Sequence, residues 1–213
     1  MLYREVCLEN YTDLPKAVLA GADRIEMCDN LHVGGTTVSK GVMGEAIKYT
    51  QEKNVPLVFL IRARGGNFVY NDIELKIMEA DILEAQALGA DAVAIGALTA
   101  DNKLDKDALE NLVAASGGME LVFNMAFDEL DFEEQKRAID WAVENGFSRI
   151  LTHGGPKDTP IEDNLDHLKE LIAYANGRIT ILPGGKINAN NAEKIAKALN
   201  VSAVHGTKLL ADK

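Results

Sequence analysis

Two cysteines in this chain each stand two positions after a glutamate. Cys7 follows Glu5, and Cys28 follows Glu26. Side chains alternate between the two faces of a β-strand, so strands at these places put each glutamate on the same face as its cysteine. Two neighbouring strands would then gather two thiols and two carboxylates. Paired thiolates select Cu(I), whereas a free cysteine is also a good small core residue, and the residues alone leave both interpretations open.

Two arginines near one another offer a site for an anion. Arg62 and Arg64 are two positions apart, so they share a face if the strand before them continues. Guanidinium groups bind carboxylates and phosphates with paired hydrogen bonds. Equally, these arginines can neutralise Glu5 or Glu26 in a buried ion pair.

Several side chains at the ends of apolar runs have the chemistry of a general acid or base. They are Glu5, Glu26, Asp128 and His205. Asp128 can also cap the helix that begins near Asp131. A lone histidine such as His153 is more commonly a hydrogen-bonded structural group than a ligand.

Four of the loops that follow predicted strands contain glycine pairs: 34–35, 65–66, 154–155 and 184–185. Such pairs let backbone N–H groups approach a ligand closely, and they also make tight turns. Gly184, Gly185 and Gly206 follow the last two apolar runs, where α/β barrels commonly bind phosphate. We therefore expect an anion site there, formed with Arg62 and Arg64.

Short apolar runs rich in valine, isoleucine and leucine predict the strands that position these side chains. Such runs are typical of buried parallel strands. They are Glu5–Leu8, Arg24–Met27, Leu57–Ile61, Ala92–Ile95, Leu121–Phe123, Arg149–Thr152, Ile179–Leu182 and Ala203–His205.

Helical patterns separate the runs. Apolar residues recur every three or four positions in 71–88, 104–113 and 131–143. Gly21, Gly89 and Gly146 each end a helical stretch just before a strand, as C-terminal glycines do. Eight such units predict an α/β fold, a compact (β/α)8 TIM barrel, as a single domain over residues 1–213. A doubly wound sheet is the alternative, but its glycine-rich first turn is missing.

The composition limits the partners. The chain has 22 Lys and Arg against 33 Asp and Glu, a formal net charge of −11. Nucleic acid and anionic membranes would repel it, so we expect neither as a partner. The start of the chain does not have the pattern of a signal peptide, and no apolar run is long enough to span a bilayer. Two cysteines and these features predict a reduced, cytoplasmic protein.

The same residues resemble the copper homeostasis protein CutC family. The resemblance runs almost from end to end. It rests on Glu5–Cys7, Gly21–Leu31, Gly34–Thr37, Arg62–Phe68, Leu88–Asp91, Ala126–Asp128, Pro183–Gly185, Asn188 and Val204–Gly206.

The resemblance implies a TIM barrel, a cytoplasmic homo-oligomer and a role in copper handling, with copper bound by Cys7 and Cys28. No reaction is established for the family, although its barrel mouth resembles an active site. The chain departs from the family at Asn124-Met125, where His-Arg is common, and has His153 where Ser is frequent.

Two functions are therefore expected from the sequence. The first is Cu(I) binding through Cys7 and Cys28, with Glu5 and Glu26 supporting them. The alternative is an enzyme that acts on a small anionic or phosphorylated metabolite.

Overall fold

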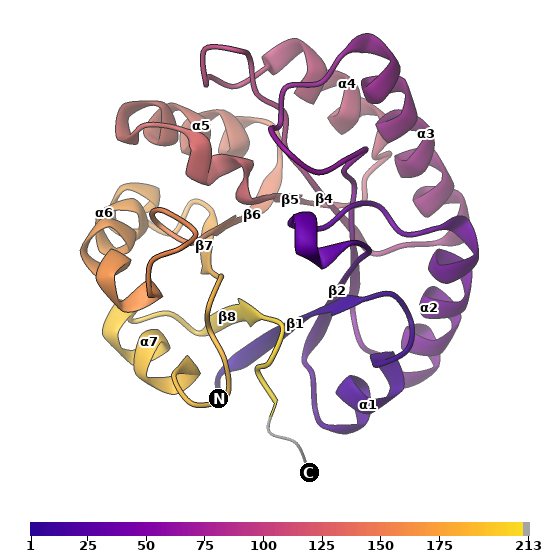
Figure 1. Ribbon diagram of the computed structural model, residues 1–213, viewed down its shortest axis with the longest axis horizontal. Helices are drawn as coiled ribbons and strands as arrows, with labels where there is room; N and C mark the ends of the chain where they lie inside the picture. The colour runs from indigo at the N-terminus through magenta and orange to yellow at the C-terminus, as the bar shows by residue number, and fades with distance from the viewer. Residues whose placement is uncertain (211–213) are drawn as a thin grey trace.

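Eight parallel strands form the centre of the molecule and confirm the barrel predicted from the sequence (Figure 1). The computed structural model describes residues 1–210. Each predicted run overlaps one observed strand. The strands are β1 (Tyr3–Glu9), β2 (Arg24–Cys28), β3 (Leu57–Leu60), β4 (Ala92–Ile95), β5 (Glu120–Phe123), β6 (Phe147–Thr152), β7 (Thr180–Pro183) and β8 (Ala203–Gly206).

Helices surround the strands and cover their outer face (Figure 1). The α-helices are α1 (Leu14–Leu19), α2 (Lys40–Lys53), α3 (Asp72–Leu88), α4 (Lys106–Ala115), α5 (Phe132–Glu144), α6 (Leu165–Ala175) and α7 (Ala192–Leu199). Short 3-10 helices lie at Leu31–Val33 (η1), Met125–Glu129 (η2) and Ile161–Asn164 (η3).

Capping side chains set where the helices begin. Asn71 accepts hydrogen bonds from the backbone N–H groups of Ile73 and Glu74, and the Glu74 side chain accepts the N–H of Asn71. Helix α3 therefore begins at residue 72. The predicted start of α4 at residue 104 is wrong, because Asp105 caps this helix and Leu104 instead bridges to Leu98.

The hydrogen-bonded order of the strands is β7-β6-β5-β4-β3-β2-β1-β8. Strands β7 and β8, at the two ends of this order, contact each other and nearly close the barrel. Because every pairing is parallel, the C-terminal ends of all strands lie at one rim. Gly21, Gly89 and Gly146 have φ values of 94°, 88° and 78°, which confirms the left-handed turns expected before β2, β4 and β6.

The buried residues form two groups. The larger lies between the strands and the helices, and includes Phe59, Ile82 and Phe123. The smaller fills the inside of the barrel. Its members are Cys7, Cys28, Val58, Leu60, Ala92, Ala94, Val122, Leu151, Leu182 and Ala203.

Among residues 1–210, no helix has both the length and the apolar character needed to cross a bilayer.

Candidate functional site

The two cysteines lie together inside the barrel. Cys7 of β1 is opposite Glu26 of β2, and Glu9 is opposite Cys28, so the cysteines are diagonal neighbours on adjacent strands. Their sulfur atoms are 3.8 Å apart. The Cys28 sulfur also lies 3.6 Å from the backbone oxygen of Leu8. The expected convergence of the two thiols is confirmed, and both cysteines are free.

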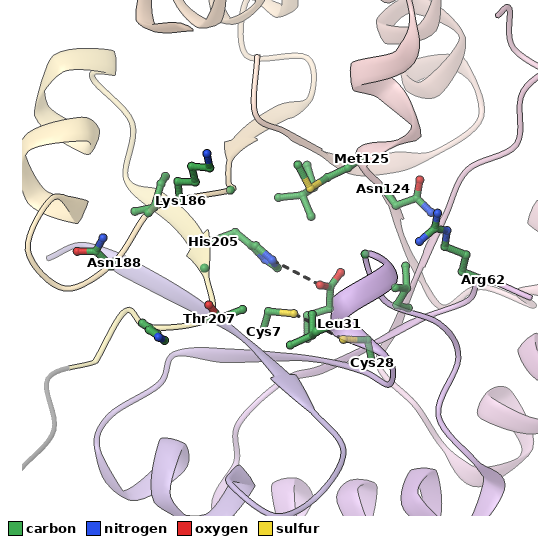
Figure 2. Close-up of a pocket in the computed structure, with 18 of the residues that line it drawn as sticks. Cys7, Cys28, Leu31, Arg62, Asn124, Met125, Lys186, Asn188, His205 and Thr207 are labelled. Atoms are coloured by element: carbon green, nitrogen blue, oxygen red, sulfur yellow. Dashed lines mark hydrogen bonds and ion pairs between the residues drawn. The ribbon is translucent and has the colours of Figure 1, made fainter. Parts of the chain in front are cut away.

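A cavity of about 440 Å³ opens above the cysteines at the C-terminal rim. Figure 2 shows Cys7, Cys28 and His205 pointing to its floor, with Met125 and Lys186 around it. Much of the wall is apolar, so the site combines a few polar groups with a low-polarity surface. The apolar lining residues are Leu31, Leu60, Phe68, Met125, Leu151 and Ile187.

Beneath the cavity, His205 stands between two carboxylates. Its Nδ1 lies 2.8 Å from Glu5 Oε1, and its Nε2 lies 3.5 Å from Glu26 Oε2. The other oxygen of Glu5 lies 3.2 Å from Nε of Arg24, in a pair whose side chains are almost wholly buried. Arg24 also donates two hydrogen bonds to Glu120. The barrel interior thus contains a continuous series of charged groups.

These contacts shift the pKa values of Glu5, Glu26 and His205. Burial alone would raise the pKa of Glu5, but the hydrogen bond and charge of His205 and the charge of Arg24 lower it below its usual value. Burial and the nearby charge of Glu5 raise the pKa of Glu26. Burial opposes protonation of His205, yet the charges of Glu26 and Glu5 raise its pKa. The two shifts favour an ionic pair between Glu5 and His205.

The Cys7 thiol is held in its protonated form. Its hydrogen bond with Cys28, its burial and the negative charge of Glu26 raise the pKa of Cys7 well above its usual value. A bound metal ion, whose positive charge replaces the proton, would favour the thiolate. This suits a metal ligand better than a nucleophile that must be ionised in advance.

Arg24 has a role that was not expected from the sequence. One interpretation of Arg62 and Arg64 is that they neutralise Glu5 or Glu26, but Arg24 is the arginine that pairs with Glu5. The signal was present in the sequence. Arg24 is two positions before Glu26, so the same alternation that aligns Glu26 with Cys28 also turns Arg24 inward.

Arg62 is turned toward the loop that follows β2. Its guanidinium donates hydrogen bonds to the backbone oxygens of Val33, Gly35 and Gly66, and it lies 4.5 Å from the centre of the Phe68 ring. The side chain is buried and forms part of the cavity wall. These contacts hold the loop after β2 and the loop after β3 together.

Arg64 lies outside the cavity lining. It pairs with Glu74 of α3 and donates to the backbone oxygens of Gly65, Asn67 and Val69. The expected fork of two arginines around one anion is therefore not formed by these side chains in the structure.

The side chains of Asp128 and His153 form hydrogen bonds with backbone groups of the loops at the C-terminal rim. Asp128 accepts hydrogen bonds from the Thr152 hydroxyl and from the N–H groups of His153 and Gly154. Burial raises the pKa of Asp128 despite these bonds. The His153 ring lies between the backbone oxygens of Gly184 and Thr159. Neither side chain is part of the cavity lining, and Asp131, not Asp128, caps α5.

Of the three glycines expected at the anion site, some line the cavity and one does not. Gly185 and Gly206 line the cavity together with Lys186 and Lys208. The N–H of Gly184 instead donates to the backbone oxygen of Thr152. Two of the three glycines expected at an anion site therefore lie where a ligand can reach them.

Asn124 and Met125, where the family commonly has His-Arg, both line the cavity. Asn124 accepts the N–H of Ala126 and so begins η2, whereas its amide nitrogen is buried with no hydrogen-bond partner among the described residues. Met125 packs against the inner group of core residues. It adds a thioether to the cavity wall.

One further grouping can hold a metal ion. One ligand atom each from Cys7, Glu26 and His205 lie within 4.8 Å of one another, and all three residues are buried. Cys7 thus belongs both to the pair with Cys28 and to this group of three.

Solved structures of distant sequence share the fold. An aldolase named QR15 aligns with 96% of this chain and 90% of its own at a TM-score of 0.70 and 16% identity. Deoxyribose phosphate aldolase from Aeropyrum pernix covers 96% of this chain and 85% of its own at a TM-score of 0.69 and 10% identity. At such identities the likeness concerns the barrel alone.

Similar sequences are much more specific. The CutC family model matches residues 2–210. A family protein CutC from Enterococcus faecalis is 55% identical over 209 residues, which is 98% of this chain and 100% of the relative. The copper homeostasis protein cutC homolog of Homo sapiens is 37% identical, over 94% of this chain and 71% of its own. A solved copper homeostasis protein CutC from Streptococcus agalactiae has a TM-score of 0.95 and 49% identity, and covers 98% of this chain and 100% of its own. The chain belongs to the CutC family.

Proposed function

We propose that this protein binds Cu(I) through the thiolates of Cys7 and Cys28 and serves copper homeostasis in the cytoplasm. The observation that carries the proposal is the 3.8 Å separation of the two sulfur atoms at the floor of the cavity. Copper homeostasis is the role named for the human relative.

The chemistry of the floor suits a soft monovalent ion. Thiolates select Cu(I) over hard cations, and the apolar wall excludes competing water. Binding of Cu(I) by thiolates releases the thiol protons, because the metal ion takes the place of the proton on each sulfur. The Met125 thioether is a further soft atom on the same cavity wall.

Anaerobic titration with Cu(I) in competition with a chelator tests the proposal. Cys7→Ser and Cys28→Ser each remove one ligand, and we expect each to lower the affinity on the order of 100-fold or more. Met43→Leu, which changes a buried sulfur on α2 away from the cavity, is the matched control and should bind as the wild type does. Wild-type affinity in the double cysteine variant would refute the proposal.

A second candidate function is an enzyme that acts on a small anionic metabolite. It is favoured by the basic part of the rim, where Lys186 and Lys208 line the cavity beside Gly185 and Gly206. Ammonium groups and nearby backbone N–H groups are suitable partners for a phosphate or carboxylate. Glu26 and His205 lie at the floor of the same cavity as acid–base candidates.

Thermal unfolding with a panel of phosphate esters and carboxylates tests this second candidate. A ligand at a hundredfold excess over its Kd should stabilise the protein by about 2.7 kcal/mol. The effect should weaken in Lys208→Ala and persist in Arg64→Ala, because Arg64 lies outside the cavity lining. Failure of the whole panel to stabilise the protein would count against an enzyme of this class.

We also propose that the protein is a homo-oligomer, as the family resemblance implies. Sedimentation velocity across a range of protein concentrations tests this, and a single monomeric species throughout would refute it.

A further inference from the structure

Three side chains of different chemistry meet where the cavity reaches the barrel interior. Cys7 comes from β1, Glu26 from β2 and His205 from β8, which are neighbours in the sheet. Their ligand atoms lie within 4.8 Å of one another, and all three residues line the cavity. We propose that they form a site for a divalent transition-metal ion, with Zn²⁺ as the fitting ion, which shares Cys7 but not Cys28 with the thiol pair.

The spacing of the ligand atoms suits a tetrahedral ion. Nitrogen and oxygen ligands at ~2.1 Å from a tetrahedral zinc lie about 3.4 Å apart. His205 Nε2 and Glu26 Oε2 are 3.5 Å apart. This separation is longer than a usual hydrogen bond of about 2.9 Å, so the two atoms leave room for an ion between them.

The imidazole is already oriented for coordination. Glu5 Oε1 lies 2.8 Å from Nδ1 of His205, so the histidine donates that N–H to a carboxylate and turns Nε2 toward Glu26. Glu5 is in turn held by Arg24. A carboxylate behind a metal-binding histidine fixes its tautomer and orientation, and its loss commonly weakens metal binding 10- to 100-fold, roughly. Glu5 is therefore the positioning residue of the site.

The charges also balance for a divalent ion. A Cys7 thiolate and a Glu26 carboxylate together neutralise a 2+ ion, while Glu5 and Arg24 neutralise each other. A thiolate, an imidazole and a carboxylate are all ordinary ligands of zinc. Cys28 is absent from the group of three, so a Cu(I) ion on the two thiolates and a divalent ion on the three ligands would compete for Cys7.

The fourth position of the ion faces the cavity, since all three ligands line it. Zinc sites with three protein ligands and one open position bind water or a substrate oxygen there. The site would thus present a Lewis acid to a small molecule with a carbonyl, carboxylate or phosphate oxygen. This inference does not rest on copper binding by the thiol pair.

Two measurements on the full chain test the site. First, Co²⁺ is added to metal-free wild-type protein as a spectroscopic substitute for Zn²⁺. We expect the strong visible bands of a tetrahedral site together with a thiolate-to-cobalt charge-transfer band. Their absence would overturn the proposal without any variant, so a variant that fails to fold cannot leave it undecided.

Second, Zn²⁺ affinity is measured against a competing chelator in matched variants. We expect losses on the order of 100-fold in Cys7→Ser, Glu26→Gln and His205→Asn, and about 10-fold or more in Glu5→Gln. Cys28→Ser should keep the wild-type Zn²⁺ affinity while it loses Cu(I), and His205→Asn should do the reverse. Equal loss of Zn²⁺ in Cys28→Ser and Cys7→Ser would show that the ion sits on the thiol pair, and would overturn the site proposed here.

Discussion

The inside of the barrel has two unlike halves. Strands β8, β1 and β2 turn Glu5, Cys7, Arg24, Glu26, Cys28 and His205 inward, and we call these residues the polar half. Strands β3 to β7 contribute Val58, Leu60, Ala92, Ala94, Val122, Leu151 and Leu182, which we call the apolar half. Both halves have the same alternation and the same parallel pairing. The halves differ only in their side chains, which are mostly ionisable in the polar half and apolar in the half that faces it.

The difference shows how such a site stays stable. The apolar half lowers the local polarity, so each charge in the polar half interacts more strongly with its neighbours. An unpaired charge would be costly there, and Arg24 prevents that by lying between Glu5 and Glu120. The apolar half thus strengthens the electrostatics of the site, while Glu120, at the start of the same strand as Val122, supplies the second carboxylate partner of Arg24.

The largest effect is expected from breaking the charge balance of the polar half. Arg24→Met keeps most of the side-chain volume but leaves Glu5 without its guanidinium partner. We expect the free energy of unfolding to fall by about 3–5 kcal/mol, because a buried charge loses its partner. Urea denaturation measures this loss.

Arg149→Met is the matched control, since Arg149 also pairs with Glu120 but is partly exposed. It should cost about 1 kcal/mol or less. Equal losses in the two variants would show that burial of the Arg24 pair is not what matters.

A cavity in the apolar half should cost less and leave metal binding intact. Leu151→Ala removes a buried side chain from the cavity wall. Large-to-small changes in a core cost about 2–5 kcal/mol, and we expect the lower end because the new space joins an existing cavity. Urea denaturation gives the stability, and chelator competition gives the affinities for Cu(I) and Zn²⁺. A tenfold loss of either affinity would mean that the apolar half positions the ligands.

The fold was predictable because each unit repeats the same local signals. The apolar runs and the glycines before β2, β4 and β6 place the strands, and the Glu-x-Cys spacing places both thiols inside. The start of α4 was predicted too early, at Leu104, because Asp105, a polar residue just inside the predicted helix, is its N-cap.

The partners of the arginines were not predictable in the same way. Alternation turns Arg24 inward, but Arg62 and Arg64 come after the last residue of β3, where alternation ends. The direction of Arg62 depends on the carbonyl oxygens of Val33 and Gly66, and that of Arg64 on Glu74 and the loop backbone after β3. These contacts depend on how the loops fold, and no regular spacing in the sequence encodes them.

A smaller, pH-dependent effect is expected at Glu120, the acidic residue at the start of β5. Burial alone would raise the pKa of Glu120, but hydrogen bonds from Ser148 and Arg24 and the charge of Arg24 lower it below 4.5. A lowered pKa contributes stability that is present above the unfolded value of about 4.5 and is lost as the pH falls through the folded value. Glu120→Gln should therefore be less stable than wild type at pH 7 by about 1 kcal/mol, and the difference should vanish in strong acid.

Urea denaturation between pH 3 and 7, in roughly half-unit steps, measures the difference. Glu133→Gln, an exposed glutamate on α5, is the control and should show little dependence. A Glu120→Gln difference that grows toward low pH would contradict the lowered pKa.

The smallest effect is expected at Arg64, which follows the apolar half and turns away from the interior. Its guanidinium pairs with Glu74 and the loop backbone, and the side chain is 37% exposed. Because exposed pairs contribute little, Arg64→Gln should lower the free energy of unfolding by about 1 kcal/mol or less. Its affinities for Cu(I), Zn²⁺ and any stabilising phosphate ester should equal those of the wild type. A tenfold loss of any of these would place Arg64 in the site, and would mean that the polar groups of the cavity extend beyond β8, β1 and β2 into the loop after β3.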